Sequence, residues 1–128
     1  MIHSGVVITA EDTDRYAVSL FLREFKTYAN ETGISIFPRR NFLNTLADLG
    51  INRQDATERI LQLTPQDYYK GLGPGHRENE RICGFGTRIG EEEIYIKLLL
   101  NTESRRAICF SFHRAERGIE YPFTDDDS

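Results

Sequence analysis

The hydrophobic pattern of this chain changes its period at one glycine-rich segment, Gly71–Gly75. Before this segment, apolar residues recur every three or four positions, as in amphipathic helices. After it they alternate with polar residues, as in strands with one buried face. A chain that supplies helices first and strands second folds as α+β, with the helices packed on the sheet. Its 128 residues suffice for one core. We therefore expect a single α+β domain over 1–128, with flexible ends at 1–9 and 124–128.

Three helices are expected before the glycine-rich segment. Thr9 and Asp12 have the spacing of a capping box, and the helix that they begin continues to Gly33. A second, shorter helix ends at Gly50, because glycine commonly follows the last helical residue. Asn52 is a suitable cap for a third helix directly after it.

Two shorter segments have weaker patterns. Ile34–Phe37 is apolar and β-branched but precedes Pro38, so we expect at most a brief strand there. Thr64–Asp67 combines a hydroxyl cap, a proline and a carboxylate, which predicts the start of a helix. Because Gly71 follows closely, this helix has only about one turn. Lys70 is then expected at its end, beside a flexible loop.

The second half predicts an antiparallel meander of at least three strands: Arg81–Ile89, Glu93–Asn101 and Arg106–Arg114. Alternation assigns their side chains to two faces. The core face is expected to carry Cys83, Phe85, Ile89, Ile94, Ile96, Leu98, Leu100, Ile108, Phe110 and Phe112. The opposite, open face is expected to carry Gly84, Gly86, Arg88, Glu93, Tyr95, Lys97, Leu99, Asn101, Cys109, Ser111 and His113.

The register decides which open-face residues meet. A hairpin keeps its apolar residues on one face, so odd positions of the second strand pair with odd positions of the third. Tyr95 then lies opposite Ser111 or His113, and the first hairpin brings Arg88 near Tyr95. The glycines of the first strand leave space alongside, where another part of the chain can come close.

Charge does not exclude a polyanionic ligand, although the formal net charge is −4. Residues 15–117 hold all 16 Lys and Arg against 13 acids, and the other seven acids lie at the two ends. The body of the chain is therefore mildly basic. Two cysteines argue against a disulfide scaffold and favour a reducing cytoplasm. No apolar run is long enough for a membrane span and no secretory signal is recognisable, so we expect no membrane association.

The open face combines cations, a phenol and an imidazole, which suits cleavage of RNA through its 2′-hydroxyl. That reaction must stabilise charge on the phosphoryl oxygens, take a proton from the 2′-oxygen and deliver one to the leaving 5′-oxygen. Lys and Arg stabilise the charge, and His, Tyr or a Lys of lowered pKa can move the protons. No metal or other cofactor is required, and only RNA has the 2′-hydroxyl.

The same sequence also allows other interpretations. The glycine-rich segment lacks the Gly-Lys-Ser/Thr ending of a phosphate loop, and no His, Cys and carboxylate spacing predicts a metal site. Cys109 and His113 are expected on one strand face about 13 Å apart, too far for direct activation of the thiol. Tyr95 and Lys97 are also common residues of a solvated strand face, so a purely structural role stays open.

Three short blocks resemble the MqsR-type toxins of bacterial toxin–antitoxin pairs. They are Leu63–Lys70 (LTPQDYYK), Glu93–Lys97 (EIYIK) and Ile108–His113 (ICFSFH), in this order. Proteins of that family are RelE-like α+β domains that cut messenger RNA without a metal and are held inactive by a cognate antitoxin. The resemblance extends over residues 60–115 and implies an mRNA-cleaving endoribonuclease with a RelE-like fold.

The resemblance also implies roles for particular residues. Lys70 is expected to be the electrostatic partner of the transition state or the general base, and Tyr95 an orienting group or proton donor. His113, where the family commonly has a lysine, is expected to be the general acid. The remaining expected RNA-binding residues are Tyr69, Arg81, Arg88 and Lys97.

The implied partners are messenger RNA, free or on the ribosome, and a cognate antitoxin with a DNA-binding domain. A glutamine and an arginine of the family have no clear counterpart in the first strand. The alternative is therefore a non-catalytic RelE-like interaction protein that binds RNA, the ribosome or an antitoxin-like partner.

Overall fold

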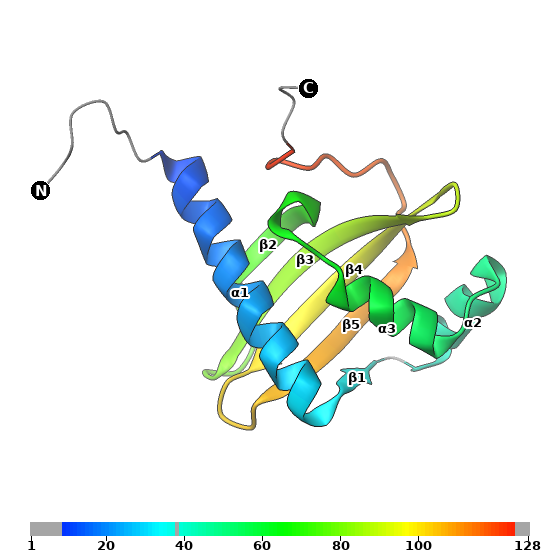
Figure 1. Ribbon diagram of the computed structural model, residues 1–128, viewed down its shortest axis with the longest axis horizontal. Helices are drawn as coiled ribbons and strands as arrows, with labels where there is room; N and C mark the ends of the chain where they lie inside the picture. The colour runs from blue at the N-terminus through cyan, green and yellow to red at the C-terminus, as the bar shows by residue number, and fades with distance from the viewer. Residues whose placement is uncertain (1–8, 38, 125–128) are drawn as a thin grey trace, which may run out of the picture.

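The computed structural model describes residues 9–37 and 39–124, which form a five-stranded sheet and three helices (Figure 1). The elements are α1 (Ala10–Thr32), β1 (Ile34–Ile36), α2 (Arg39–Leu49), α3 (Arg53–Leu61), the 3-10 turn η1 (Pro65–Asp67), β2 (Tyr68–Pro74), β3 (Glu80–Ile89), β4 (Glu92–Asn101) and β5 (Arg106–Arg114). The expected α+β class, with helices before a strand meander, is confirmed. The flexible ends expected at 1–9 and 124–128 lie outside the described residues, apart from Thr9 and Thr124. No helix in the described ranges is long and apolar enough to cross a membrane.

Capping residues mark the start of α1 and α3 and the end of α1. The Thr9 hydroxyl accepts the Asp12 N–H over 3.0 Å, and the Asp12 carboxylate accepts the Thr9 N–H over 3.2 Å. Asn52 and Asp55 form the same reciprocal capping box at the start of α3. Gly33 ends α1 with a φ of 81°, a conformation that glycine adopts without strain. The expected limits of α1 and the expected start of α3 are confirmed.

The sheet contains the expected meander with one strand added at each edge. β3, β4 and β5 match the expected spans within one residue, and the strand order is β1-β5-β4-β3-β2. β2 pairs antiparallel with β3, and β1 pairs parallel with β5. The brief strand expected at 34–37 is thus confirmed as β1.

The expectation of a helix end and loop around Lys70 was wrong. Thr64–Asp67 begins only a single 3-10 turn, and the chain continues directly as β2 along the edge of β3. A single helical turn is held by very few hydrogen bonds. An extended segment beside β3 instead gains backbone hydrogen bonds along that strand.

One hydrophobic core lies between the helices and the sheet. Its largest fully buried side chains come from α1, from α3 and Leu63 just after it, and from the three central strands β3, β4 and β5. Phe21 and Phe25 of α1 stack at 6.3 Å between ring centroids, and Phe21 lies 6.3 Å from Phe85 of β3. The core expectation for β3 and β4 is confirmed, because its inward residues, Cys83, Phe85, Ile94, Ile96, Leu98 and Leu100, are 0% exposed, and Ile89 packs against the core. We call this side of the sheet the covered face and the other side the open face.

β5 contains a β-bulge that reverses the expected alternation. Lys97 pairs with Ser111 and Leu98 with Cys109, so Phe110 is an extra residue without a partner on β4. As a result Cys109 is fully buried in the core and Phe110 is 39% exposed. The faces expected for Cys109 and Phe110 were therefore wrong.

The rest of β5 follows from the same bulge. Ile108 precedes it and lies opposite Leu99, on the open face instead of in the core as expected. Phe112 follows it and is buried as expected. Cys109 and His113 consequently lie on opposite faces, so the expectation that they share one was also wrong.

Candidate active site

The open face is crossed by the segment that follows β5. Residues 115–124, which we call the C-terminal strap, run from the end of β5 back toward β2 (Figure 1). Glu93 of β4 anchors the strap: its carboxylate accepts the Ile119 N–H over 2.8 Å and the Tyr121 hydroxyl over 3.0 Å. At the far end Phe123 is buried and stacks on Tyr68 with ring centroids 5.2 Å apart. The strap is therefore fixed at both ends.

Two glycines of β3 make room for what lies on the open face. A Cβ at Gly84 would lie 2.8 Å from the Lys70 carbonyl oxygen and 3.0 Å from the Tyr95 hydroxyl. A Cβ at Gly86 would lie 2.5 Å from the Tyr121 hydroxyl. The expectation that these glycines mark a close approach is confirmed. The Lys70 backbone and the Tyr95 hydroxyl both lie over Gly84, and the strap crosses over Gly86.

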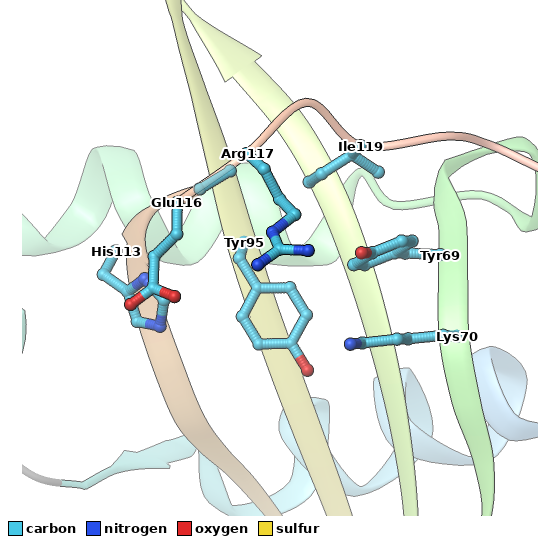
Figure 2. Close-up of a pocket in the computed structure, with 8 residues that line it drawn as sticks. Tyr69, Lys70, Tyr95, His113, Glu116, Arg117 and Ile119 are labelled. Carbon is cyan, nitrogen blue, oxygen red and sulfur yellow. The ribbon is translucent and has the colours of Figure 1, made fainter.

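An irregularity in β2 directs two consecutive side chains to the open face. Tyr68 pairs with Phe85 and Lys70 with Gly84, so β2 has one residue more than β3 between these pairs. Tyr68 turns to the core, where its ring lies edge-on to Phe85 at 6.2 Å. Tyr69 and Lys70 both extend over the open face (Figure 2).

The strands and the strap enclose a cavity of about 510 Å³, which we call the main pocket. Figure 2 looks onto it, with the helices behind the sheet. Side chains from β2, β4, β5 and the strap contribute to it. They are Tyr69, Lys70, Tyr95, His113, Ala115, Glu116, Arg117 and Ile119.

The three side chains predicted to be catalytic are connected through aromatic contacts. The Lys70 Nζ lies 5.0 Å from the centroid of the Tyr69 ring, within range of a cation–π contact. The Tyr69 ring meets Tyr95 edge-on at 6.0 Å, and Tyr95 lies 5.5 Å from the His113 ring. Lys70, Tyr95 and His113 therefore line one cavity, although they come from three different strands.

The protonation of two of these groups follows from their surroundings. Burial raises the pKa of Tyr95, and the neighbouring Tyr69 and Cys83 raise it further. Tyr95 therefore keeps its proton at neutral pH and acts as a hydrogen-bond donor. The His113 Nδ1 lies 2.9 Å from the Arg114 carbonyl oxygen, which can only accept. This contact assigns a proton to Nδ1 and leaves Nε2 available to a ligand.

The cations predicted to hold phosphates lie elsewhere. Arg88 is opposite Glu93 on the open face, and Lys97 shares that face, opposite Ser111. Arg81 is opposite Leu100 and so lies on the covered face. Arg81, Arg88 and Lys97 are not among the described residues that line the main pocket. Tyr69 is the one predicted RNA-binding residue that lines it.

Sequence reasoning missed Glu116 and Arg117, which come from the strap. Their segment has no periodic pattern, and its path depends on contacts with Glu93 that are distant in sequence. One signal was present: Gly86, on the open face, indicated that some part of the chain comes close. The apolar Phe123 within the acidic end was a second indication that this segment returns to the core.

Comparisons with protein-family models, curated proteins and solved structures gave no match to this chain. Function is therefore inferred from the residues of the pocket and from the three sequence blocks. Across 9–37 and 39–124, no three His, Cys, Asp or Glu side chains lie together as a possible metal site.

Proposed function

We propose that this protein is a metal-independent endoribonuclease that cleaves messenger RNA through the 2′-hydroxyl. One observation carries the proposal: Lys70, Tyr95, His113 and Arg117 line a single cavity on the face of the sheet that no described helix covers. Two cations beside a protonated phenol and an imidazole supply both the charge and the proton carriers that the reaction needs.

Lys70 and Arg117 would hold the scissile phosphate. They reach the main pocket from different elements, Lys70 from β2 and Arg117 from the strap (Figure 2). An arginine can bind two phosphate oxygens at once, and a lysine adds a compact charge. Their positive charge would offset the extra negative charge that the phosphoryl oxygens gain in the transition state.

Glu116 and His113 would move the two protons. The Glu116 carboxylate takes the proton of the 2′-hydroxyl as the 2′-oxygen forms its bond to phosphorus. His113 would act in its imidazolium form: it keeps the proton on Nδ1 and gives the proton on Nε2 to the 5′-oxygen as the bond from phosphorus to that oxygen breaks. The products are a 2′,3′-cyclic phosphate and a 5′-hydroxyl. Tyr95, with its raised pKa, donates a hydrogen bond to a phosphoryl oxygen throughout.

The resemblance to MqsR-type toxins extends this proposal to a biological setting. We propose that the protein is the toxin of a type II toxin–antitoxin system, acts in the cytoplasm on messenger RNA and is inhibited by a cognate antitoxin that carries a DNA-binding domain. The blocks that contain Lys70, Tyr95 and His113 support this setting, because the three residues line one pocket.

The test is cleavage of a 5′-labelled messenger RNA fragment, with and without ribosomes, by purified protein. We expect products that end in 2′,3′-cyclic phosphate, and no cleavage where the attacking nucleotide is 2′-deoxy. Lys70→Ala should lower kcat/KM by about 10²–10³-fold, the usual effect of removing one charge-stabilising donor. Arg23→Ala, which removes an exposed cation from α1, is the matched control and should cleave normally.

Expression in a bacterial host adds a second readout. Wild-type protein should arrest growth, and folded Lys70→Ala protein should not. Intact RNA bound by wild-type protein, free or on ribosomes, would contradict the endoribonuclease and favour the non-catalytic interaction protein.

A further inference from the structure

A second, smaller cavity adjoins the main pocket at the edge of the sheet. It has a volume of about 170 Å³. β1 pairs only with residues 107–109 of β5, so from Phe110 onward β5 has no strand on this side among the described residues. His113 lines this cavity as well as the main pocket, so the two share one wall.

The walls of this cavity are mostly aromatic, and we call it the aromatic cavity. Its floor is Phe42 and Phe112, which are each 3% exposed and meet edge-on at 5.5 Å. Its rim is Phe37 and Phe110, which are 52% and 39% exposed. A hydrogen bond of 2.9 Å from the Phe37 N–H to the Cys109 carbonyl oxygen fixes Phe37 beside the bulge. The bulge that reverses β5 is therefore also what presents Phe110 here.

We propose that the aromatic cavity is a nucleobase subsite, which stacks the base of the nucleotide next to the phosphate held in the main pocket. This inference rests on the proposed function. Exposed aromatic rings bind single-stranded bases because every base has a π-face. The polar side chain of Asn41 also lines the cavity and can pair with the edge of a base. Continuity through His113 favours a base of the same RNA chain over a separate ligand.

Tryptophan fluorescence tests the proposal directly, because the chain contains no tryptophan. Phe110→Trp places a single fluorophore at the rim of the aromatic cavity, and a stacked base should quench it. The probe is a single-stranded hexaribonucleotide with 2′-O-methyl groups, which lacks the attacking hydroxyl and is not cleaved. Tyr16→Trp is the matched control, since Tyr16 is a 65% exposed aromatic residue on α1, in the helical layer (Figure 1).

We expect saturable quenching in Phe110→Trp, none in Tyr16→Trp, and none from an abasic oligomer with the same number of phosphates. Replacing both rim phenylalanines by leucine, which keeps their apolar character, should weaken binding of the 2′-O-methyl probe by at least about fivefold. If Phe110→Trp does not fold, Phe37→Trp gives the same readout from the other side of the rim.

The outcomes separate this proposal from the endoribonuclease. If wild-type protein cleaves RNA but the fluorescence of Phe110→Trp is the same with the 2′-O-methyl probe and with the abasic oligomer, the subsite is overturned. The proposed function is then unaffected. Base-dependent quenching without any cleavage would keep the subsite and overturn the endoribonuclease. If neither cleavage nor base-dependent quenching is observed, the endoribonuclease and the subsite are both overturned. The exposed phenylalanines would then be expected to bind a protein partner.

Discussion

The two faces of the sheet are built in different ways. The covered face uses regular alternation: β4 contributes Ile94, Ile96, Leu98 and Leu100 at every second position, all fully buried. The open face obtains its chemistry from departures from regularity, namely the bulges in β2 and β5 and the strap. Regular backbone therefore supplies the stability of this fold, and irregular backbone gathers the candidate site.

Two neighbouring tyrosines show the same difference within one strand. Tyr68 packs between Phe85 and Phe123 on the core side. Tyr69, the next residue, lines the main pocket beside Tyr95. Identical side chains thus have different environments because an extra residue in β2 changes the direction in which Tyr69 and Lys70 point.

The largest expected effect is on stability, and it distinguishes a substitution on the covered face from one on the open face. Phe85→Ala removes a fully buried ring from the covered face and should lower the free energy of unfolding by about 3–5 kcal/mol. Tyr95→Phe keeps its ring and should change stability by less than about 1 kcal/mol, while lowering RNA cleavage at least tenfold. Urea unfolding and cleavage assays on the same samples measure both effects. Equal losses of stability in the two variants would contradict the division between the faces.

Most of the covered face could be predicted from the sequence, because burial leaves a local record in the spacing of apolar residues. Capping pairs such as Thr9 and Asp12 predicted where helices start, because they too are local patterns in the sequence. The bulge at Phe110 left no such record. In Ile108–Phe112 every second residue from either starting position is apolar or small, so both alternations fit equally well.

The candidate site was only partly predictable. Tyr95 and His113 follow from strand alternation, and the structure pairs them directly. β2 was missed because this edge strand contains two glycines and ends in a proline, and its residues show no alternating burial. Arg117 was missed because the path of the strap depends on Glu93, more than twenty residues away. Long-range contacts of this kind have no periodic signal.

The next prediction tests whether the space over β3 is required. Gly84→Val places a side chain where the Lys70 carbonyl oxygen and the Tyr95 hydroxyl now lie. Displacement of backbone should cost about 1–3 kcal/mol of unfolding free energy and should also remove cleavage activity. Gly73→Val, in the neighbouring β2, is the matched control because a Cβ there meets nothing within 4 Å. Thermal unfolding of both variants gives the answer, and similar melting temperatures would show that the close approach over Gly84 is dispensable.

A smaller effect concerns alkaline pH. Burial raises the pKa of the Cys109 thiol from its ordinary 9.0 to about 12. Between these values the unfolded chain gives up its thiol proton and the folded chain keeps it, so stability is complete below pH 9 and falls as the pH rises. One thiol accounts for about 1.4 kcal/mol per pH unit. Cys109→Ala should therefore have a shallower decline in urea unfolding above pH 9, measured under reducing conditions.

The open face supplies the control for this decline. Burial, together with the hydrogen bond to Glu93, raises the pKa of Tyr121 above the usual tyrosine value. Its contribution is complete below pH 10 and is lost only at higher pH, so Tyr121→Phe should leave the slope between pH 9 and 10 unchanged. A Cys109→Ala slope equal to that of wild-type protein would mean that this thiol does not differ between the folded and unfolded states.

The smallest expected effect compares two arginines, one assigned by sequence and one found through the structure. Arg81 lies on the covered face, opposite Leu100, and Arg117 lines the main pocket. Arg117→Ala should lower kcat/KM for RNA about tenfold, within the range expected for a charge-assisted contact to phosphate. Arg81→Ala should change it less than twofold, because its side chain is separated from the pocket by the sheet. Both values of kcat/KM are measured in cleavage assays at one salt concentration. If Arg81→Ala lowers kcat/KM more than Arg117→Ala does, the RNA binds on the covered face, which would contradict the candidate site.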